Sequence, residues 1–217
     1  RLPQVCPECK GTEFKMQGFG TEKVEEEIAG QFPAAKVERL DFDTARTRTA
    51  YERIISDFEK GKTQILIGTQ MLSKGLDFGN VSVVGILSAD SLMNFPDFRA
   101  HERAYQLMVQ VSGRAGRRDK RGTVILQTTQ PEHPLIRMVQ HFAYKEMVSL
   151  QLSERSMFRY PPYYRLIVLI LRSRNEEALQ EMSALYAEKL RARLGERVLG
   201  PVTPPITRVQ TLHIKKI

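Results

Sequence analysis

Apolar positions in the first part of the chain alternate between short β-rich runs and longer runs with helical spacing. The stretch 47–60 places Tyr51, Ile54 and Phe58 on one helical stripe, and the apolar run 64–69 follows soon after it. Repeated alternation of strand and helix is typical of a parallel sheet covered by helices. We therefore predict an α/β domain with strands at 13–19, 36–40, 64–69, 81–87 and 122–128 and helices at 21–32, 47–60, 96–111 and 134–154.

A different pattern begins near residue 155. Pro161 and Pro162 follow each other between Arg159 and Tyr164, and successive prolines cannot continue a helix. We place a domain boundary close to this stretch, with 12–154 before it and 155–217 after it. The pattern of the second part predicts a small α+β module with a strand at 165–171, a helix at 175–194 and a strand at 209–214. We expect this module to be cut short at residue 217.

The composition is that of an ordinary globular protein. Of the 217 residues, 41% are hydrophobic and 27% are charged, which excludes a disordered, collagenous or coiled-coil protein. The longest nearly apolar stretch, 166–171, is too short to cross a membrane, and residues 1–4 do not resemble a signal peptide. We therefore expect a soluble, cytoplasmic protein with no membrane partner.

The net charge of +8 is concentrated in the second part of the chain. Residues 155–217 contain 12 Lys and Arg against 5 Asp and Glu, whereas residues 1–154 contain 21 against 20. An excess of basic residues on one module indicates an acidic partner, and nucleic acid is the first candidate.

Two segments, 67–78 and 110–117, carry the most specific chemical signal. Arg114 and Arg117 are three residues apart and fall on one face of a helix, while Gly113 and Gly116 would let a second surface come close. The planar fork of arginine binds phosphate oxygens in pairs, as a site for triphosphate charge requires. The alternative is a surface helix with scattered arginines, and the presence of both segments at this separation disfavours it.

These segments resemble the second motor lobe of superfamily 2 helicases, with Gly68–Asp77 similar to motif V and Gln110–Arg117 similar to motif VI. The resemblance extends to 18–27, Asp90, 96–103 and Tyr160–Pro162, which are similar to the PriA family of replication-restart helicases, also called primosomal protein N′. It covers nearly the whole chain.

The resemblance implies three parts. Residues 1–11 would be the remnant of a zinc-binding insertion, and 12–154 a RecA-like second helicase lobe, a mostly parallel sheet with helices on both faces. Residues 155–217 would form a truncated, plait-like α+β C-terminal domain that binds DNA and partner proteins.

The resemblance also implies which residues form the sites. The nucleotide, ATP with Mg, would be held by Gly75, Asp77, Gln110, Arg114 and Arg117, with Arg117 reaching the γ-phosphate and Arg114 beside it. The DNA would be contacted by Gly20, Thr21, Thr69, Gln70 and Lys74.

Gly20 and Thr21 admit two interpretations, and both stay open. They precede a predicted helix, whose first N–H groups could hold a phosphate. Alternatively, Thr21 is simply the N-cap of that helix.

Cys6 and Cys9 form a CxxC pair. No thioredoxin-like unit adjoins it, which disfavours a redox function, and two thiolates make only half of a tetrahedral zinc site. The resemblance implies that they are the last pair of a zinc-binding insertion, so the zinc site would be incomplete in this chain.

Other polar residues favour structural interpretations. His101 and His133 are more typical of surface or capping positions than of catalysis, and Asp41 and Asp43 are more typical of a solvated strand end than of a metal pair.

An aromatic group at the boundary admits two interpretations. Its members are Phe158, Tyr160, Tyr163 and Tyr164. They would either stack on DNA bases, as aromatic side chains in basic grooves do, or belong to the core before a buried strand.

The function implied by the resemblance is an ATP-dependent 3′-to-5′ DNA helicase that recognises stalled or repaired replication forks and starts primosome assembly. Its partners would be forked and single-stranded DNA, the single-stranded DNA-binding protein and primosome proteins, and it would associate with the bacterial nucleoid. The sequence contains no GxxxxGK[ST] loop and no DEAH-like box, so we expect this chain alone not to hydrolyse ATP. The alternatives are a non-catalytic DNA- or protein-binding module on a helicase-lobe scaffold, a different superfamily 2 fork translocase, and a CxxC redox protein.

Overall fold

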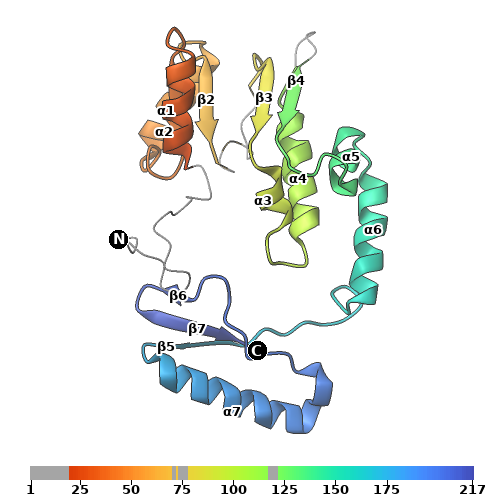
Figure 1. The fold of residues 1–217 in the computed structure, drawn as a ribbon. Helices are drawn as coiled ribbons and strands as arrows, with labels where there is room; N and C mark the ends of the chain where they lie inside the picture. The colour runs from red at the N-terminus through yellow and green to blue at the C-terminus, as the bar shows by residue number, and fades with distance from the viewer. Residues whose placement is uncertain (1–19, 70–71, 73–77, 117–121) are drawn as a thin grey trace, which may run out of the picture. The chain divides into compact units, whose positions relative to one another are not determined.

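The computed structural model describes residues 20–69, 72, 78–116 and 122–217 (Figure 1). The chain divides into two compact units, Arg1–Ala89 with Tyr105–Gln130 and Asp90–Ala104 with Pro131–Ile217. Helix α4 (Ala100–Ser112) has residues in both. The predicted strand 13–19 lies outside the described residues, and the predicted boundary near residue 155 stays a prediction.

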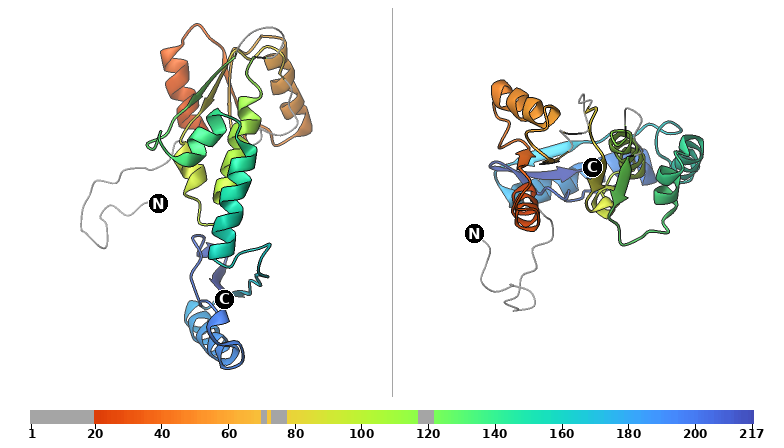
Figure 2. Two further views of the ribbon diagram at one scale, coloured as in Figure 1. Left: turned by 90° about the vertical axis from the view of Figure 1, so that its right-hand side faces the viewer. Right: turned by 90° about the horizontal axis from the view of Figure 1, so that it is seen from above.

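The first unit contains two pairs of parallel strands. β1 (Val37–Leu40) pairs with β2 (Ile65–Gly68), and β3 (Val83–Ile86) pairs with β4 (Thr123–Leu126). Helices α1 (Thr21–Gln31) and α2 (Arg48–Glu59) lie on opposite sides of the β1–β2 pair (Figure 2). The predicted α/β class is confirmed, because helices connect and cover parallel strands.

Local sequence explains why α2 forms where it does. The hydroxyl of its N-cap, Thr47, accepts a hydrogen bond from the backbone N–H of Ala50 at 3.1 Å, which satisfies one of the helix's unpaired donors. The apolar stripe of the helix buries Ile54 in a core with Leu40 and Phe78. Burial of this stripe fixes α2 against β1 and so positions the carboxyl ends of β1 and β2.

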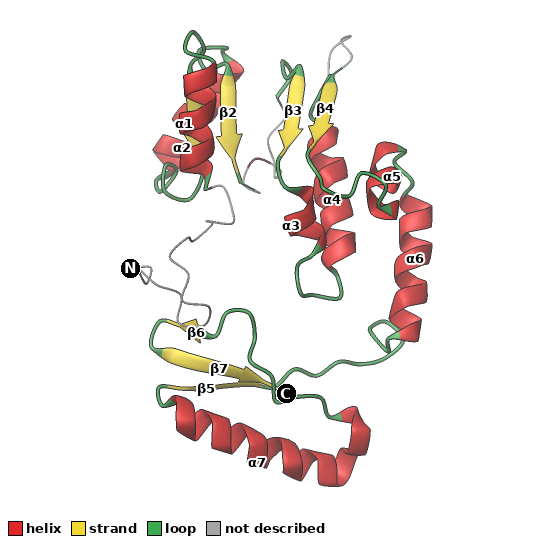
Figure 3. Ribbon diagram, viewed as in Figure 1, coloured by secondary structure: helices red, strands yellow, loops and turns green. Residues whose placement is uncertain are grey.

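The second unit contains helices and an antiparallel sheet (Figure 3). Its helical part comprises most of α3 (Ala89–Met93), the start of α4, and the whole of α5 (Pro134–Gln140) and α6 (Tyr144–Met157). Its sheet has the order β5–β7–β6, formed by Ile170–Ser173, Leu212–Lys216 and Arg208–Val209. The helix α7 (Glu176–Leu194) packs on β5 and β7 and is followed by the 3-10 turn Gly195–Arg197.

Some predicted elements are divided or shortened in the structure. The helix predicted at 134–154 is two helices, α5 and α6, because Phe142 between them has a φ of 51°, which lies outside the helical region. The strand predicted at 165–171 begins only at Ile170, and Ile167 before it is 80% exposed. The strand predicted at 209–214 is a hairpin of β6 and β7 that turns at Gln210, with a φ of 55°.

The helix predicted at 96–111 begins later, at Ala100. A turn precedes it, in which Asp97 accepts a hydrogen bond from the backbone N–H of Arg99 at 2.8 Å. The helix predicted at 21–32 is α1, but Thr21 is not its N-cap. Gly20 holds that position, without a side chain to cap the helix.

Candidate nucleotide and DNA sites

Three residues predicted to contact DNA meet at one edge of the β1–β2 pair. Thr69 directly follows β2, and the last residue of that strand, Gly68, pairs with Leu40 at the end of β1. The next residue, Asp41, accepts a hydrogen bond of 2.6 Å from the Thr21 hydroxyl at the start of α1. Gly20, Thr21 and Thr69 therefore lie at the carboxyl ends of the two strands, which is where open α/β sheets bind ligands.

The close approach of β1 and β2 at this edge requires a glycine. A Cβ atom at Gly68 would lie 2.6 Å from the carbonyl oxygen of Leu40 and 2.7 Å from Cδ1 of Leu72. Two other residues predicted to contact DNA, Gln70 and Lys74, lie outside the described residues.

Asp41 is the feature of this edge that the sequence did not reveal. The expected solvated strand end is correct for Asp43, which is exposed, and wrong for Asp41, which is only 6% exposed. Its carboxylate accepts hydrogen bonds from the backbone N–H groups of Asp43 and Thr44, at 2.9 and 3.0 Å. The sequence offers one signal of this turn, which is Thr44 three residues after Asp41. An aspartate that accepts hydrogen bonds from the backbone N–H groups of the residues that follow it is typical of a turn.

The environment of Asp41 favours its charged form. Burial raises the pKa of the carboxyl group, but the hydrogen bonds from Thr21, Thr44 and Asp43 and the charge of Arg39 more than offset this and lower the pKa to about 2. Asp41 is therefore ionised throughout the physiological pH range.

The turn that follows Arg114 contacts the chain just before β3, at the amino ends of β3 and β4. The backbone N–H of Gly116, two residues after Arg114, donates a 3.0 Å hydrogen bond to the carbonyl oxygen of Val81, just before β3. Gly116 has a φ of 80°, a conformation that favours glycine. A Cβ atom at Gly122, just before β4, would lie 2.3 Å from the backbone nitrogen of Gly116.

The other residues predicted for the nucleotide site are placed only in part. Gln110 lies exposed in the last turns of α4, and Arg114 follows the end of that helix and is half-buried. Gly75, Asp77 and Arg117 lie outside the described residues. The structure thus ties the turn that follows Arg114 to Val81, and a guanidinium at this place suits phosphate charge.

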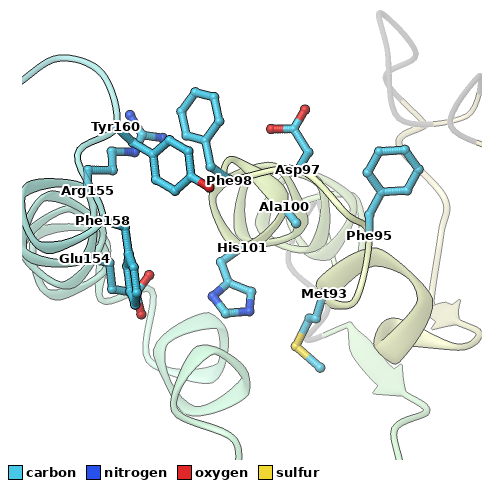
Figure 4. A pocket seen from close by; sticks show the side chains of 10 residues that line it. All are labelled: Met93, Phe95, Asp97, Phe98, Ala100, His101, Glu154, Arg155, Phe158 and Tyr160. Atoms are coloured by element: carbon cyan, nitrogen blue, oxygen red, sulfur yellow. The ribbon is translucent and has the colours of Figure 1, made fainter. Parts of the chain in front are cut away.

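A pocket of about 260 Å³ in the second unit involves the aromatic group at the boundary (Figure 4). Tyr160 stacks on Phe98 with 4.8 Å between ring centroids and 11° between ring planes. The Arg155 guanidinium lies 5.2 Å from the Phe98 centroid and pairs with Glu102. The pocket is lined by Met93, Phe95, Asp97, Phe98, Ala100, His101, Glu154, Arg155, Phe158 and Tyr160.

Of the two interpretations of the aromatic group, the one that assigns it to the core is wrong for three of its four members. Phe158 is 64% exposed, Tyr163 53% and Tyr164 50%. Their stacking on DNA stays a prediction.

The structural interpretation of His133 is confirmed. Its Nδ1 accepts a hydrogen bond from the backbone N–H of Leu135 at 3.1 Å and caps α5, and its ring lies 5.5 Å from that of His101. Within the part of the chain that the structure describes, no three His, Cys, Asp or Glu side chains are grouped to hold a metal ion. Cys6 and Cys9 lie outside that part.

Family models match both parts of the chain. Residues 16–119 match the helicase conserved C-terminal domain, and residues 156–214 match the primosomal protein N C-terminal domain. Among solved structures, the C-terminal domain of the DEAD-box protein Dbp5 is distantly similar over 56% of this chain and 64% of its own, with 22% identity and a TM-score of 0.41.

Similar proteins match nearly the whole chain. Replication restart protein PriA of Bacillus subtilis is 43% identical over 215 residues, covering 96% of this chain and 26% of that protein. Replication restart protein PriA of Synechocystis is 41% identical over 210 residues, covering 95% of this chain and 25% of that protein. The chain spans about a quarter of the length of the curated relatives that it matches. Among its described residues, no helix is both long and apolar enough to span a membrane.

The family-model matches and the identity to these relatives show that the chain belongs to the PriA family and corresponds to its C-terminal region.

Proposed function

We propose that the chain supplies the second motor lobe and the C-terminal domain of an ATP-dependent 3′-to-5′ DNA helicase, which recognises stalled or repaired replication forks and starts primosome assembly. The observation that carries this proposal is the 43% identity, over 215 residues, to a protein named replication restart protein. The helicase-domain match over residues 16–119 supports the motor function.

Arg114 serves the ATP site in this proposal. ATP, bound with Mg between this lobe and a first lobe, supplies the phosphoryl group whose transfer to water drives movement. The guanidinium of Arg114 binds phosphate oxygens and stabilises the charge that develops on them. The hydrogen bond between Gly116 and Val81 supports this role, because it ties the arginine-bearing turn to the segment that follows Asp77.

The carboxyl ends of β1 and β2 form the DNA-binding edge, defined as Gly20, Thr21 and Thr69. The backbone N–H groups at the start of α1 attract phosphate, since they have no acceptor within the helix. The Thr69 side chain is exposed at the same edge and donates to the DNA backbone. The basic segment 155–217 adds affinity that does not depend on DNA sequence.

The proposed partners follow from the same family membership. The C-terminal domain binds forked DNA and receives the single-stranded DNA-binding protein and primosome proteins. Cys6 and Cys9 supply two of the thiolates of a zinc site that is completed elsewhere in the protein. The protein acts in the cytoplasm at the nucleoid.

Unwinding of model forks by the full-length protein tests the proposal. Forks with a single-stranded 3′ tail, a single-stranded 5′ tail or no tail are labelled on one strand, and strand release is followed with and without ATP. We expect ATP-dependent release that depends on translocation in the 3′-to-5′ direction. Tight DNA binding without ATP-dependent release on any fork would contradict the helicase function and favour a non-catalytic binding module.

A further inference from the structure

The Asp41 carboxylate joins three segments at the DNA-binding edge. The Thr21 hydroxyl donates to it from the start of α1 at 2.6 Å, and the backbone N–H groups of Asp43 and Thr44 donate to it from the loop after β1. From β1 itself, Nε of Arg39 lies 3.1 Å from Oδ2 of Asp41. One buried group therefore fixes the positions of α1, β1 and the loop relative to one another.

The Thr21 hydroxyl is used for this contact rather than for capping α1. The N-cap residue is Gly20, and no side chain caps the helix. In a helix, the first N–H groups have no intrahelical acceptor. The direction in which the N–H groups of α1 point thus depends on where Thr21 is held.

We propose that Asp41 is a positioning residue for the DNA-binding edge, holding the first turn of α1 through Thr21 so that its N–H groups and Thr69 act on the same stretch of DNA backbone. This inference rests on the proposed function, because it identifies what orders the edge that binds DNA.

Asp41 acts through Thr21 and not by touching DNA. Its carboxylate is buried, so a phosphate has no direct access to it. Its charge is balanced by Arg39, which also lies 3.7 Å from Glu25. An unpaired carboxylate at this edge would repel phosphate, whereas a paired one orders the edge at little electrostatic cost.

The test measures how DNA stimulates ATP hydrolysis by the full-length protein. Single-stranded DNA is titrated at saturating ATP, which gives a half-maximal DNA concentration and a maximal rate. The variants are Asp41→Asn, Thr21→Val, the double variant, Thr21→Ser, which keeps the hydroxyl, and Thr69→Ala. Asp43→Asn is the matched control, because it alters an exposed carboxylate in the same loop whose ion pair is with the equally exposed Arg46. Circular dichroism melts establish that each variant is folded at the assay temperature.

The expected result is a rise of about tenfold in the half-maximal DNA concentration for Asp41→Asn and Thr21→Val, the size of one lost hydrogen bond to a charged group. The maximal rate should stay within about twofold. The double variant should need no more DNA for half-maximal stimulation than the more strongly affected single variant, because Thr21→Val removes the contact and Asp41→Asn removes the charge that strengthens the same contact. Thr21→Ser and Asp43→Asn should behave as the wild type. If Asp41→Asn does not fold, the contrast between Thr21→Val and Thr21→Ser carries the test.

Two other outcomes are distinguishable. If Thr69→Ala weakens DNA stimulation while Thr21→Val and Asp41→Asn lower only the melting temperature, the DNA-binding edge stands and the positioning function of Asp41 is overturned. If Thr69→Ala also has no effect, the proposed DNA-binding edge itself is wrong, and the inference falls with it.

Discussion

Substitution of Gly68 by alanine should separate the two strands that end at the DNA-binding edge. The added Cβ would lie 2.6 Å from the Leu40 carbonyl oxygen and 2.7 Å from Leu72 Cδ1, whereas ordinary contacts of a Cβ atom begin at about 3.4 Å. Leu72 can rotate away, but the Leu40 carbonyl belongs to the backbone of β1. The strand end must therefore move by several tenths of an ångström.

The cost follows from two opposing contributions. Overpacking of this kind destabilises a protein by about 1 to 3 kcal/mol, while replacing a strand glycine by alanine returns roughly 0.5 to 1 kcal/mol of backbone entropy. The middle of each range gives an expected net loss of about 1 kcal/mol in the free energy of unfolding. For a chain of this size it corresponds to a fall in melting temperature of roughly 2 to 4 °C.

Gly85→Ala is the matched control. Gly85 also lies inside a strand, β3, but a Cβ atom there would meet nothing within 4 Å. Only the entropy contribution applies, so Gly85→Ala should leave the melting temperature unchanged or raise it slightly. Thermal melts followed by circular dichroism compare the two variants under identical conditions. Equal melting temperatures would refute the reasoning, because they would mean that β1 and β2 do not pack as closely as the structure indicates.

Three further predictions concern other parts of the chain. Burial, and then the neighbouring His101, lower the pKa of His133 below 6.5. The unfolded chain therefore binds more protons than the native one at lower pH. The contribution of His133 to the free energy of unfolding should be fully present above about pH 6.5 and should be lost as the pH falls through the lowered pKa. His133→Asn, which keeps a capping side chain, should flatten this part of a melting-temperature profile, and an unchanged slope would contradict the assignment. Glu22 lies in the first turn of α1, where its negative charge repels phosphate. Glu22→Gln should therefore tighten DNA binding about twofold at low salt and by less at high salt. If the variant binds DNA like the wild type at every salt concentration, the DNA does not contact the start of α1. Gly122→Ala should displace Gly116 and lower the ATPase rate about tenfold or more, and a wild-type rate would show that the turn after Arg114 tolerates movement.

The sequence predicts the parallel part of the fold well, because its signals there are local. In α2, the capping Thr47 and the stripe that buries Ile54 lie within the helix itself. Thr69 directly follows β2, as the strand predicted at 64–69 implies.

Other features depend on contacts that no local pattern reveals. Phe142 and Gln210 turn the chain with positive φ although neither is a glycine, so a single long helix and a single strand were predicted instead. Ile167 belongs to an apolar run but remains exposed, because pairing with β7 begins at Ile170. The burial of Asp41 depends on Thr21, 20 residues earlier in the chain, and could not be anticipated from the strand alone.

The rate of ATP hydrolysis by full-length Arg114→Ala, measured at saturating single-stranded DNA, tests the central claim most directly. If this lobe completes the ATP site, the variant should hydrolyse ATP at least about a hundredfold more slowly than the wild type. Its affinity for single-stranded DNA should remain within about twofold, because Arg114 lies at the amino ends of β3 and β4 and not at the DNA-binding edge. Hydrolysis at the wild-type rate by a folded Arg114→Ala protein would contradict the account.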